Sequence, residues 1–304
     1  MNVIECRGLA MRYRRGWALR DCDLAIPEGH VTGLVGPNGA GKTTLLNLAA
    51  GLLRPAAGEI TVLGGERPGS AAARAGLGFV AQDAPLYGHL PAGAMIRLAG
   101  NLNVSWDHAR AVARAESLGI PLDRKVGALS GGQRAQLALT IAMAKRPRLL
   151  ILDEPLASLD PLARHEFMGS LMAAVAQEGL SVVFSSHVVA ELERIADYLA
   201  VLNDGQLQLA GSVDDLLAAH RIMTGPAGAA PGDADGAAVV HARQAGAQAH
   251  LLVRISGPGA APPGWRSGPA ALEDLVLGYL RAPGARMLPG PALAAASGGP
   301  AVPS

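Results

Sequence analysis

Two glycine-rich stretches carry the residue types that bind phosphate, and the first reads GPNGAGKT at residues 36–43. It follows the apolar run VTGLVG and opens a helical pattern. Its glycines let successive backbone N–H groups face one anion, and the following helix N-terminus adds positive potential. The spacing places Lys42 at the terminal phosphates of a nucleotide and the Thr43 hydroxyl on Mg²⁺. The predicted contact positions are Gly36, Pro37, Asn38, Gly39, Ala40, Gly41, Lys42, Thr43 and Thr44.

Polar residues at the ends of other apolar runs predict where Mg²⁺ and water are handled. Gln82 follows LGFVA, the pair Asp153–Glu154 follows LLIL, and His187 follows SVVFSS. In an open parallel sheet these ends share one edge, where ligands bind. We expect Asp153 to hold Mg²⁺ through its water shell and Glu154 to polarise the attacking water. The predicted catalytic set is Lys42, Gln82, Glu154 and His187, and the predicted metal set is Thr43, Gln82 and Asp153.

The second glycine-rich stretch, LSGGQ at 129–133, predicts another anion site. Ser130 is a preferred N-cap residue, and Gly131 and Gly132 keep side chains away from the first turn of the helical pattern that follows. The exposed N–H groups of such a turn attract anions. The predicted contact positions are Ser130, Gly131, Gly132 and Gln133. One chain therefore contains two predicted phosphate cradles that lie far apart in sequence.

The elements that position these residues follow from hydrophobic periodicity. Apolar β-type runs alternate with helical patterns over roughly residues 1–220, which predicts an α/β domain with a mostly parallel sheet. Strands are expected at 31–36, 77–81, 149–153, 181–186 and 198–203. Helices are expected at 42–50, 106–118, 130–145, 161–177 and 188–197.

The composition changes near Gly225. The last 80 residues hold 11 of the 21 prolines and 14 of the 39 glycines. This enrichment predicts a linker over 223–238 and a disordered tail over 283–304. Between them, residues 239–282 are expected to form a small extension, a hairpin followed by an amphipathic helix.

Taken together, the motifs resemble those of the ATP-binding subunits of ABC transporters. The phosphate loop, Gln82, LSGGQ, LLILDEP at 149–155, SLD at 158–160 and His187 occur in the order of that family. The likeness covers about residues 1–222. It implies an ABC ATPase domain with a RecA-like parallel-sheet core, an antiparallel β subdomain and a helical signature subdomain, followed by a Gly/Pro/Ala-rich tail. It also implies that the chain hydrolyses ATP with Mg²⁺.

The same resemblance assigns the two cradles to different chains. In that family two ATP-binding subunits pair head to tail, and each signature covers the ATP held by the other's phosphate loop, as a two-fold pairing permits. It implies that Asp160 lies in the loop that crosses between the two sites and that His187 contacts the γ-phosphate. It further implies that Tyr13 stacks on adenine, with Trp17 as the competing aromatic. The partner is either a second copy or a related chain.

Composition narrows the class of protein and its partners. No apolar run approaches the roughly 18 residues that a membrane span needs. The net charge of +1 gives no sign of a nucleic-acid partner. A transporter therefore requires separate transmembrane permease subunits, which would hold the chain in the cytoplasm, peripheral on the inner face of the cell membrane. Leu86, Tyr87 and Leu90 are candidates for that docking surface or, alternatively, for the core of a small helical subdomain.

The direction of transport and the transporter class rest on finer likeness. The amino-acid sequence of residues 83–222 is most similar to those of bacterial type-2 ABC exporters, so we expect export. An importer subunit is one alternative, and a soluble ABC ATPase acting on DNA or ribosomes is another. A single ATPase cassette and the short stretch between Lys42 and Ser130 disfavour the soluble classes. A plain P-loop kinase or GTPase would leave LSGGQ and His187 unexplained.

Overall fold

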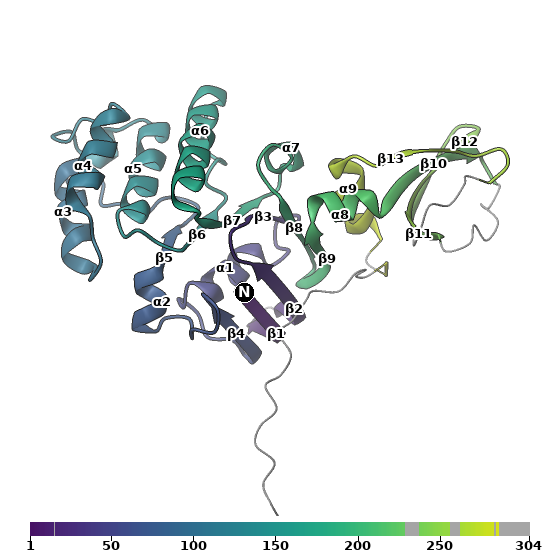
Figure 1. The fold of residues 1–304 in the computed structure, drawn as a ribbon, viewed down its shortest axis with the longest axis horizontal. Helices are drawn as coiled ribbons and strands as arrows, with labels where there is room; N and C mark the ends of the chain where they lie inside the picture. The colour runs from purple at the N-terminus through teal and green to yellow at the C-terminus, as the bar shows by residue number, and fades with distance from the viewer. Residues whose placement is uncertain (15, 229–236, 256–261, 283, 286–304) are drawn as a thin grey trace, which may run out of the picture.

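The computed structural model describes residues 1–14, 16–228, 237–255, 262–282 and 284–285. Its centre is a six-stranded sheet with the order β5-β6-β7-β3-β8-β9 (Figure 1). The strands are β3 (Val31–Val35), β5 (Leu77–Val80), β6 (Leu149–Asp153), β7 (Ser181–Ser186), β8 (Tyr198–Asn203) and β9 (Gln206–Ser212). The first five in the order run parallel, and β9 pairs antiparallel with β8. The α/β fold with a parallel core is confirmed.

Helices cover both faces of this sheet, and strand β6 shows how. Leu149 and Ile151 pack in a cluster with α1 (Lys42–Ala49), whereas Leu150 and Leu152 pack with α5 (Gly131–Met143) and α6 (Pro161–Glu178). Successive side chains of a strand point to opposite faces, so a strand apolar at every position must be covered twice. The fully apolar run before Asp153 is therefore buried on both sides and delivers its acid to the sheet edge.

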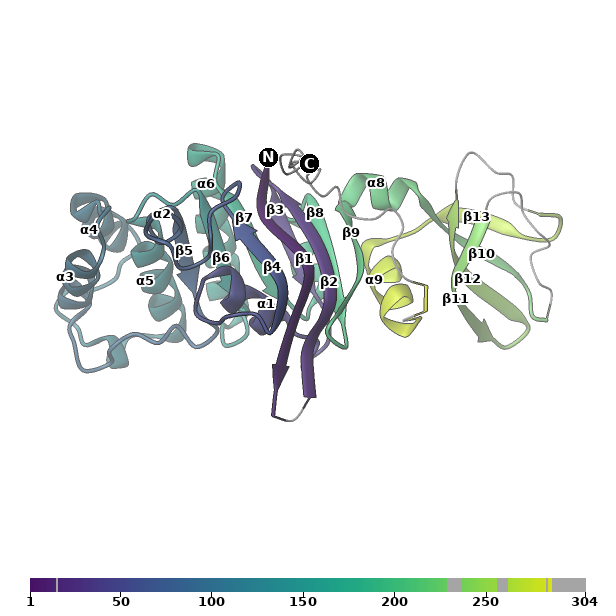
Figure 2. The same ribbon diagram turned by 90° about the horizontal axis from the view of Figure 1, so that it is seen from below.

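Two subdomains flank the core. A three-stranded antiparallel sheet with the order β2-β1-β4 packs against α1 (Figure 2). Its strands are β1 (Asn2–Tyr13), β2 (Gly16–Pro27) and β4 (Ala57–Val62). A helical subdomain is formed by α3 (Ala92–Leu102), α4 (His108–Ser117), the 3₁₀ turn η1 (Val126–Ala128) and α5, whereas α2 (Ala71–Gly76) packs through Ala73 in the cluster of the antiparallel sheet and α1. Both subdomains match the architecture that the resemblance implied.

The apolar docking candidates divide between core and surface. Leu86 and Leu90 are partly buried and pack against the cluster of α3, α4 and α5. Tyr87 is 57% exposed. The docking prediction therefore narrows to Tyr87, because the two leucines stabilise the helical subdomain. In the part of the chain that the structure describes, no helix is long and apolar enough to cross a membrane.

The C-terminal extension forms a second antiparallel sheet with the order β11-β12-β10-β13, joined to the core by α8 (Val213–Ala218). Its elements are β10 (His220–Pro226), β11 (Ala237–Ala245), β12 (Gln248–Ile255), β13 (Arg266–Pro269) and α9 (Leu272–Arg281). The prediction of a linker over 223–238 is wrong at its start, because residues 223–226 lie in β10 and pair with β12 and β13. Residues 229–236 of that linker and 286–304 of the expected tail lie outside the described residues.

Helix α9 ties the extension to the core. His220 Nδ1 lies 2.6 Å from the Leu216 carbonyl oxygen and Nε2 lies 2.9 Å from the Tyr279 hydroxyl. Burial lowers the pKa of His220, so the neutral ring donates through Nδ1 and accepts through Nε2. Asn203 at the end of β8 donates to the Leu280 carbonyl at 3.1 Å. Packing is thus continuous across residue 222, where the sequence analysis ended the ATPase domain.

Candidate functional site

The first cradle forms between β3 and α1, where close backbone contacts require glycine. A Cβ at Gly36 would lie 2.1 Å from the Leu202 carbonyl oxygen, and one at Gly41 would lie 2.4 Å from that of Ala18. Gly41 also has a φ of 106°, which side-chain-bearing residues rarely adopt. The Gly205 N–H donates to the Ala40 carbonyl at 3.0 Å and fixes the loop from behind. The loop is therefore held by β2 and by the β8–β9 turn.

Lys42 lies under this loop with its ammonium group fully engaged. Its Nζ donates to the Gly36 carbonyl at 2.8 Å and to the Pro37 carbonyl at 3.2 Å. It also pairs with Glu154 Oε1 at 3.2 Å. An ammonium group has three donors, so this buried cation is satisfied without a ligand. Thr43, the next residue, is exposed at the start of α1.

Two acids, Asp153 and Glu154, lie at the end of β6, and the hydroxyl of Ser185 on the neighbouring strand β7 hydrogen-bonds to both residues. Asp153 is buried, and its Oδ1 accepts from the Ser185 hydroxyl at 2.8 Å. The same hydroxyl accepts from the Glu154 N–H at 2.8 Å. Glu154 has a φ of 44°, a left-handed conformation that costs energy for a residue with a side chain and occurs most often at functional sites. Ser185 therefore holds the Asp153 carboxylate and supports the backbone turn at Glu154.

The Glu154 carboxylate lies between two predicted catalytic residues. Its Oε1 pairs with Lys42, and its Oε2 lies 3.2 Å from His187 Nδ1. Lys42 begins α1 after β3, and Glu154 and His187 directly follow β6 and β7; these three strands are neighbours in the sheet. The structure thus brings together Lys42, Glu154 and His187, with Asp153 beside them, as the strand-end argument predicted.

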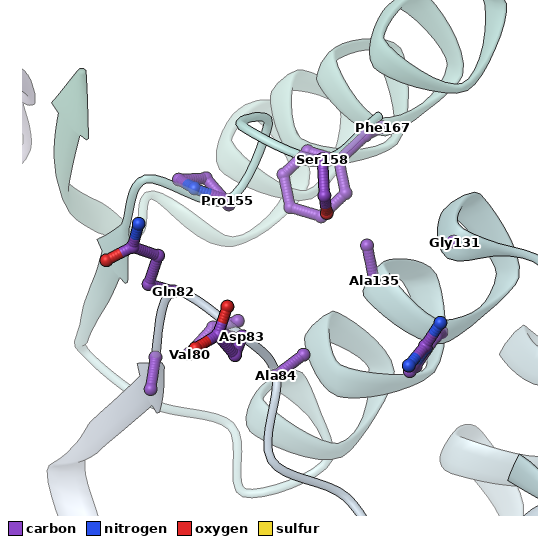
Figure 3. A pocket seen from close by; sticks show the side chains of 11 residues that line it. Val80, Gln82, Asp83, Ala84, Gly131, Ala135, Pro155, Ser158 and Phe167 are labelled. Atoms are coloured by element: carbon purple, nitrogen blue, oxygen red, sulfur yellow. The ribbon is translucent and has the colours of Figure 1, made fainter. Parts of the chain in front are cut away.

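Gln82 lies in a different pocket. It is exposed just beyond β5 and lines a cavity of about 240 Å³ together with Gly131 and Ser158 (Figure 3). Its amide points away from Gly131, and no hydrogen bond joins it to Thr43 or Asp153 among the described residues. Gln82 follows β5 and Thr43 follows β3, with β6 and β7 between these two strands in the sheet, and the shared Mg²⁺ site of Thr43, Gln82 and Asp153 stays a prediction.

The second cradle is the start of α5, and a capping box closes part of it. The Ser130 Oγ accepts from the Gln133 N–H at 3.1 Å, and Gln133 Oε1 accepts from the Ser130 N–H at 3.2 Å. This reciprocal pair uses two of the amides that the sequence analysis left for an anion. The N–H groups of Gly131 and Gly132 belong to the helix positions that have no partner within the helix.

The start of α6 lies against this second cradle. Asp160 caps α6, its Oδ1 accepting from the Ala163 N–H at 2.9 Å. A Cβ at Gly132 would lie 2.8 Å from the Cβ of Ala163, whereas one at Gly131 would approach the Ser158 carbonyl oxygen only to 3.6 Å. Gly132 is therefore needed for helix packing, and Gly131 faces the open pocket.

The two candidate adenine-stacking rings lie on the β1–β2 hairpin. Tyr13 and Trp17 are 46% and 48% exposed. The Arg12 guanidinium lies 5.5 Å from the Trp17 ring centroid and covers one of its faces. Ala18 follows Trp17 and touches Gly41 of the phosphate loop, so this hairpin borders the first cradle. The two rings are about equally exposed beside the first cradle, and Tyr13 stays the predicted stacking residue.

The residues of the first cradle fit a Mg²⁺ ion that shares ligands with a nucleotide. No group of three or more His, Cys, Asp or Glu that could hold a metal occurs in the described ranges, so they contain no self-contained cage of such residues. Mg²⁺ commonly takes one or two protein oxygens together with phosphate oxygens and waters. The Thr43 hydroxyl and the second oxygen of Asp153 are of that kind.

Comparison with known proteins identifies the class to which this site belongs. The family model described as ABC transporter matches residues 19–157, and one described as AAA domain, putative AbiEii toxin, Type IV TA system matches 124–193. An uncharacterised ABC transporter ATP-binding protein of Nostoc sp. is 31% identical over 71% of this chain and 68% of its own length. The chain belongs to the ATP-binding subunits of ABC transporters, a family of ATPases that bind ATP.

Other relatives carry more specific names. The thiamine import ATP-binding protein ThiQ of Shigella flexneri is 33% identical, and the match covers 64% of this chain and 86% of ThiQ. The molybdenum import ATP-binding protein ModC of Aromatoleum aromaticum is 37% identical over 68% of this chain. The chain spans less than two thirds of the length of that ModC, 58% of it.

Solved structures agree with the fold. A structure titled as the ATP binding subunit of an ABC transporter has a TM-score of 0.62 and 27% identity, covering 70% of this chain and 91% of its own. The structure of cbiO1 from Clostridium perfringens, described as part of the ABC transporter complex cbiONQ, has a TM-score of 0.61 and 26% identity, covering 71% and 91%.

Proposed function

We propose that the chain hydrolyses ATP in a site completed by a second ATP-binding subunit and thereby drives a membrane transporter. The observation that carries this proposal is the position of Glu154 between Lys42 and His187 at the mouth of the phosphate loop. A base, a phosphate-binding cation and a γ-phosphate contact are thus adjacent in one chain. The electrostatic and acid–base needs of phosphoryl transfer are met by these groups.

In this mechanism the binding of ATP changes the partners of Lys42 and Glu154. The phosphates take the place of the Glu154 carboxylate at Lys42 Nζ, and Glu154 is released to accept a proton from the attacking water. His187 hydrogen-bonds the γ-phosphate, and the backbone N–H groups of the loop bind the remaining oxygens. Thr43 and Asp153, with Gln82 as the third predicted ligand, would hold Mg²⁺, which would neutralise phosphate charge when bound.

The second cradle is assigned to the ATP of the partner subunit. Gly131 lines an open pocket that contains no residue of the phosphate loop of the same chain. Head-to-tail pairing brings this helix start to the partner's γ-phosphate, with Asp160 between the two sites and Gln82 at the edge of the pocket. The partner is a second copy or a related ATP-binding chain.

Transmembrane permease subunits complete the proposed transporter and hold the chain peripherally on the inner face of the membrane. The cbiONQ complex is a relative's example of such an assembly. The names of the relatives do not support the exporter predicted from the sequence. ThiQ and ModC are named as import proteins, which favours the alternative of an import subunit. Reconstitution with the permease in vesicles, with substrate supplied on either side, decides the direction.

Lys42→Ala tests the site itself. Loss of a charge-assisted contact to phosphate should weaken ATP binding about 10- to 100-fold and abolish hydrolysis, as measured by nucleotide titration and phosphate release. Lys145→Ala is a matched control, because the Lys145 ammonium also donates to two backbone carbonyls, of Arg74 and Leu77, away from the loop. Equal ATP affinity in Lys42→Ala and wild type would refute the proposed nucleotide site.

A further inference from the structure

A largely buried carboxylate outside the site connects two loops that border it. Glu191 lies in the short helix α7 (Val189–Leu192), and only 12% of its side chain is exposed. Its Oε1 pairs with Arg164 Nη1 at 2.9 Å. Its Oε2 accepts from the Ser186 hydroxyl at 2.7 Å. Both oxygens of a carboxylate that has lost most of its water are therefore satisfied by the protein.

One partner of Glu191 fixes the backbone around His187. Ser186 is the last residue of β7 and is buried. While its hydroxyl donates to Glu191, its Oγ accepts from the Val188 N–H at 2.9 Å. These two bonds hold the residues on both sides of His187, whose own ring contacts Glu154. The position of His187 at the sheet edge therefore depends on the Ser186–Glu191 bond.

The other partner belongs to the loop that ends at Asp160. Arg164 itself lies in the first turn of α6, four residues after the Asp160 cap, and reaches back to that loop. Besides pairing with Glu191, its Nη2 donates to the Leu159 carbonyl at 3.4 Å. The guanidinium is a planar group whose donors diverge in fixed directions, so it can hold a loop carbonyl and a carboxylate at once. The chain of contacts runs from Leu159 through Arg164, Glu191 and Ser186 to His187.

We propose that Glu191 is a positioning residue that couples the loop ending at Asp160 to the strand end that carries His187. This inference rests on the proposed function, in which Asp160 meets the partner subunit and His187 meets the γ-phosphate. Glu191 is largely buried, and a buried charge whose partner is withdrawn is strongly disfavoured, so the two loops move as a unit. Docking of the partner at residues 158–160 then sets the position of His187 in the chain that carries the loop.

Helix α6, which carries Arg164, also contains an ion pair that can serve as a structural control. Glu178, at the far end of α6, pairs with Arg110, and the side chain of Glu178 is similarly shielded from solvent. Glu178→Gln therefore removes one charge and one ion pair from α6 without touching either loop of the site. A structural role for Glu191 would make the two glutamine variants behave alike.

The experiment compares these variants in the full-length chain by kcat and KM for ATP, ATP affinity and melting temperature. Glu191→Gln should lower kcat about 2- to 30-fold, the range of coupling through packed networks, with ATP affinity within about twofold of wild type. Glu178→Gln should keep the wild-type kcat. Arg164→Gln breaks the same contact from its more exposed side and serves as the test if Glu191→Gln does not fold.

Combination with His187→Ala decides whether the effect passes through the histidine. Residues in one network show non-additive effects, so Glu191→Gln should change kcat less than about twofold when His187 is already alanine. Full additivity in this background, or equal losses of kcat in Glu191→Gln and Glu178→Gln, would overturn the inference. Failure of the proposed function is distinct, because it would appear as no ATP hydrolysis in the wild-type chain and would overturn both.

Discussion

The two phosphate cradles differ in how much of each site one chain supplies. At the first, Lys42 is buried among two backbone carbonyls and Glu154. At the second, Ser130 and Gln133 bond each other's backbone, and the pocket beside Gly131 has an exposed arginine, Arg134, as its basic side chain. The first cradle is preorganised and charged from within, whereas the second is a capped helix start that opens outward.

This difference indicates different tasks for the two cradles. A buried cation with a competing carboxylate is a site poised for an incoming phosphate, since ligand binding exchanges one anion for another. A helix N-terminus adds favourable potential but no full charge of its own. The second cradle therefore suits an anion that another site already holds.

Glu154→Gln should disable the first cradle as a catalyst while leaving it able to bind. Turnover should fall about 10²- to 10⁴-fold, the usual contribution of a positioned base. ATP affinity should rise, because Lys42 loses the carboxylate that competes with phosphate. Phosphate release and nucleotide titration measure the two effects. Hydrolysis at near-normal rates would show that Glu154 is not the base.

Gly131→Asp should disable the second cradle while sparing the first. A carboxylate about 4 Å from the partner's γ-phosphate repels it by about 4 kcal/mol per unit charge pair at an effective dielectric near 20. An acid in the first turn of a helix is otherwise favourable, so the fold should be kept. ATP binding to the isolated chain should stay near normal, while ATP-dependent dimerisation, followed by light scattering, and hydrolysis should be lost.

Mixing Gly131→Asp with Lys42→Ala chains sharpens the same test. In a head-to-tail pair both defects fall in one composite site and leave the other intact, so part of the activity should return. If activity stays at background in dimers that have formed, a crosslink between the residue after Ser130 of one chain and the loop near Gly39 of the other shows whether the two cradles meet.

Gly132→Ala should destabilise the fold where Gly131→Ala does not. The added methyl at 132 meets Ala163 at 2.8 Å, and overpacking of this kind costs about 1–3 kcal/mol. At 131 the methyl finds ordinary contact distances, and replacing a helical glycine by alanine favours the helix by roughly 0.5–1 kcal/mol. Urea unfolding of both variants measures the difference. Equal stabilities would mean that the packing of α5 on α6 is more adaptable than the structure indicates.

Ser130→Ala should have the smallest effect. It removes the hydroxyl that caps α5 and should lower the free energy of unfolding by about 1 kcal/mol. Ser130→Thr, which keeps a capping hydroxyl, should recover most of that loss. Both variants should bind ATP normally as single chains, since the first cradle is untouched. Weakened ATP binding by the isolated Ser130→Ala chain would mean that the two cradles act within one chain.

Local sequence patterns predicted the parts of the site that depend on neighbours in the chain. The phosphate loop, the Ser130 cap and the acids after β6 each follow from a short motif and the element beside it. The strand-end rule also predicted that Lys42, Glu154 and His187 would meet. The rule says which edge a residue occupies and not how many strands away it lies, so it did not predict that Gln82 lines the pocket beside Gly131.

Three features escaped the sequence analysis because they depend on pairing between distant segments. Residues 223–226 were assigned to a linker on their composition, yet pairing with β12 and β13 makes them a strand. The helix expected over 188–197 is helical only over Val189–Leu192, since the Asp197 N–H donates to the Val31 carbonyl and the chain enters β8. Ser185 had no signal of its own, being one of three serines in β7.

Short motifs specify the phosphate-binding and strand-end chemistry of this chain, because glycine turns, helix caps and strand-end acids are set by residues close together in sequence. Which side chains support that chemistry depends on the packing of distant segments. The parallel register that places Ser185 opposite Asp153, and the packing of α6 against α7 that pairs Arg164 with Glu191, join segments far apart in sequence. Such contacts are fixed by the burial of whole strands and helices, and no short motif records them.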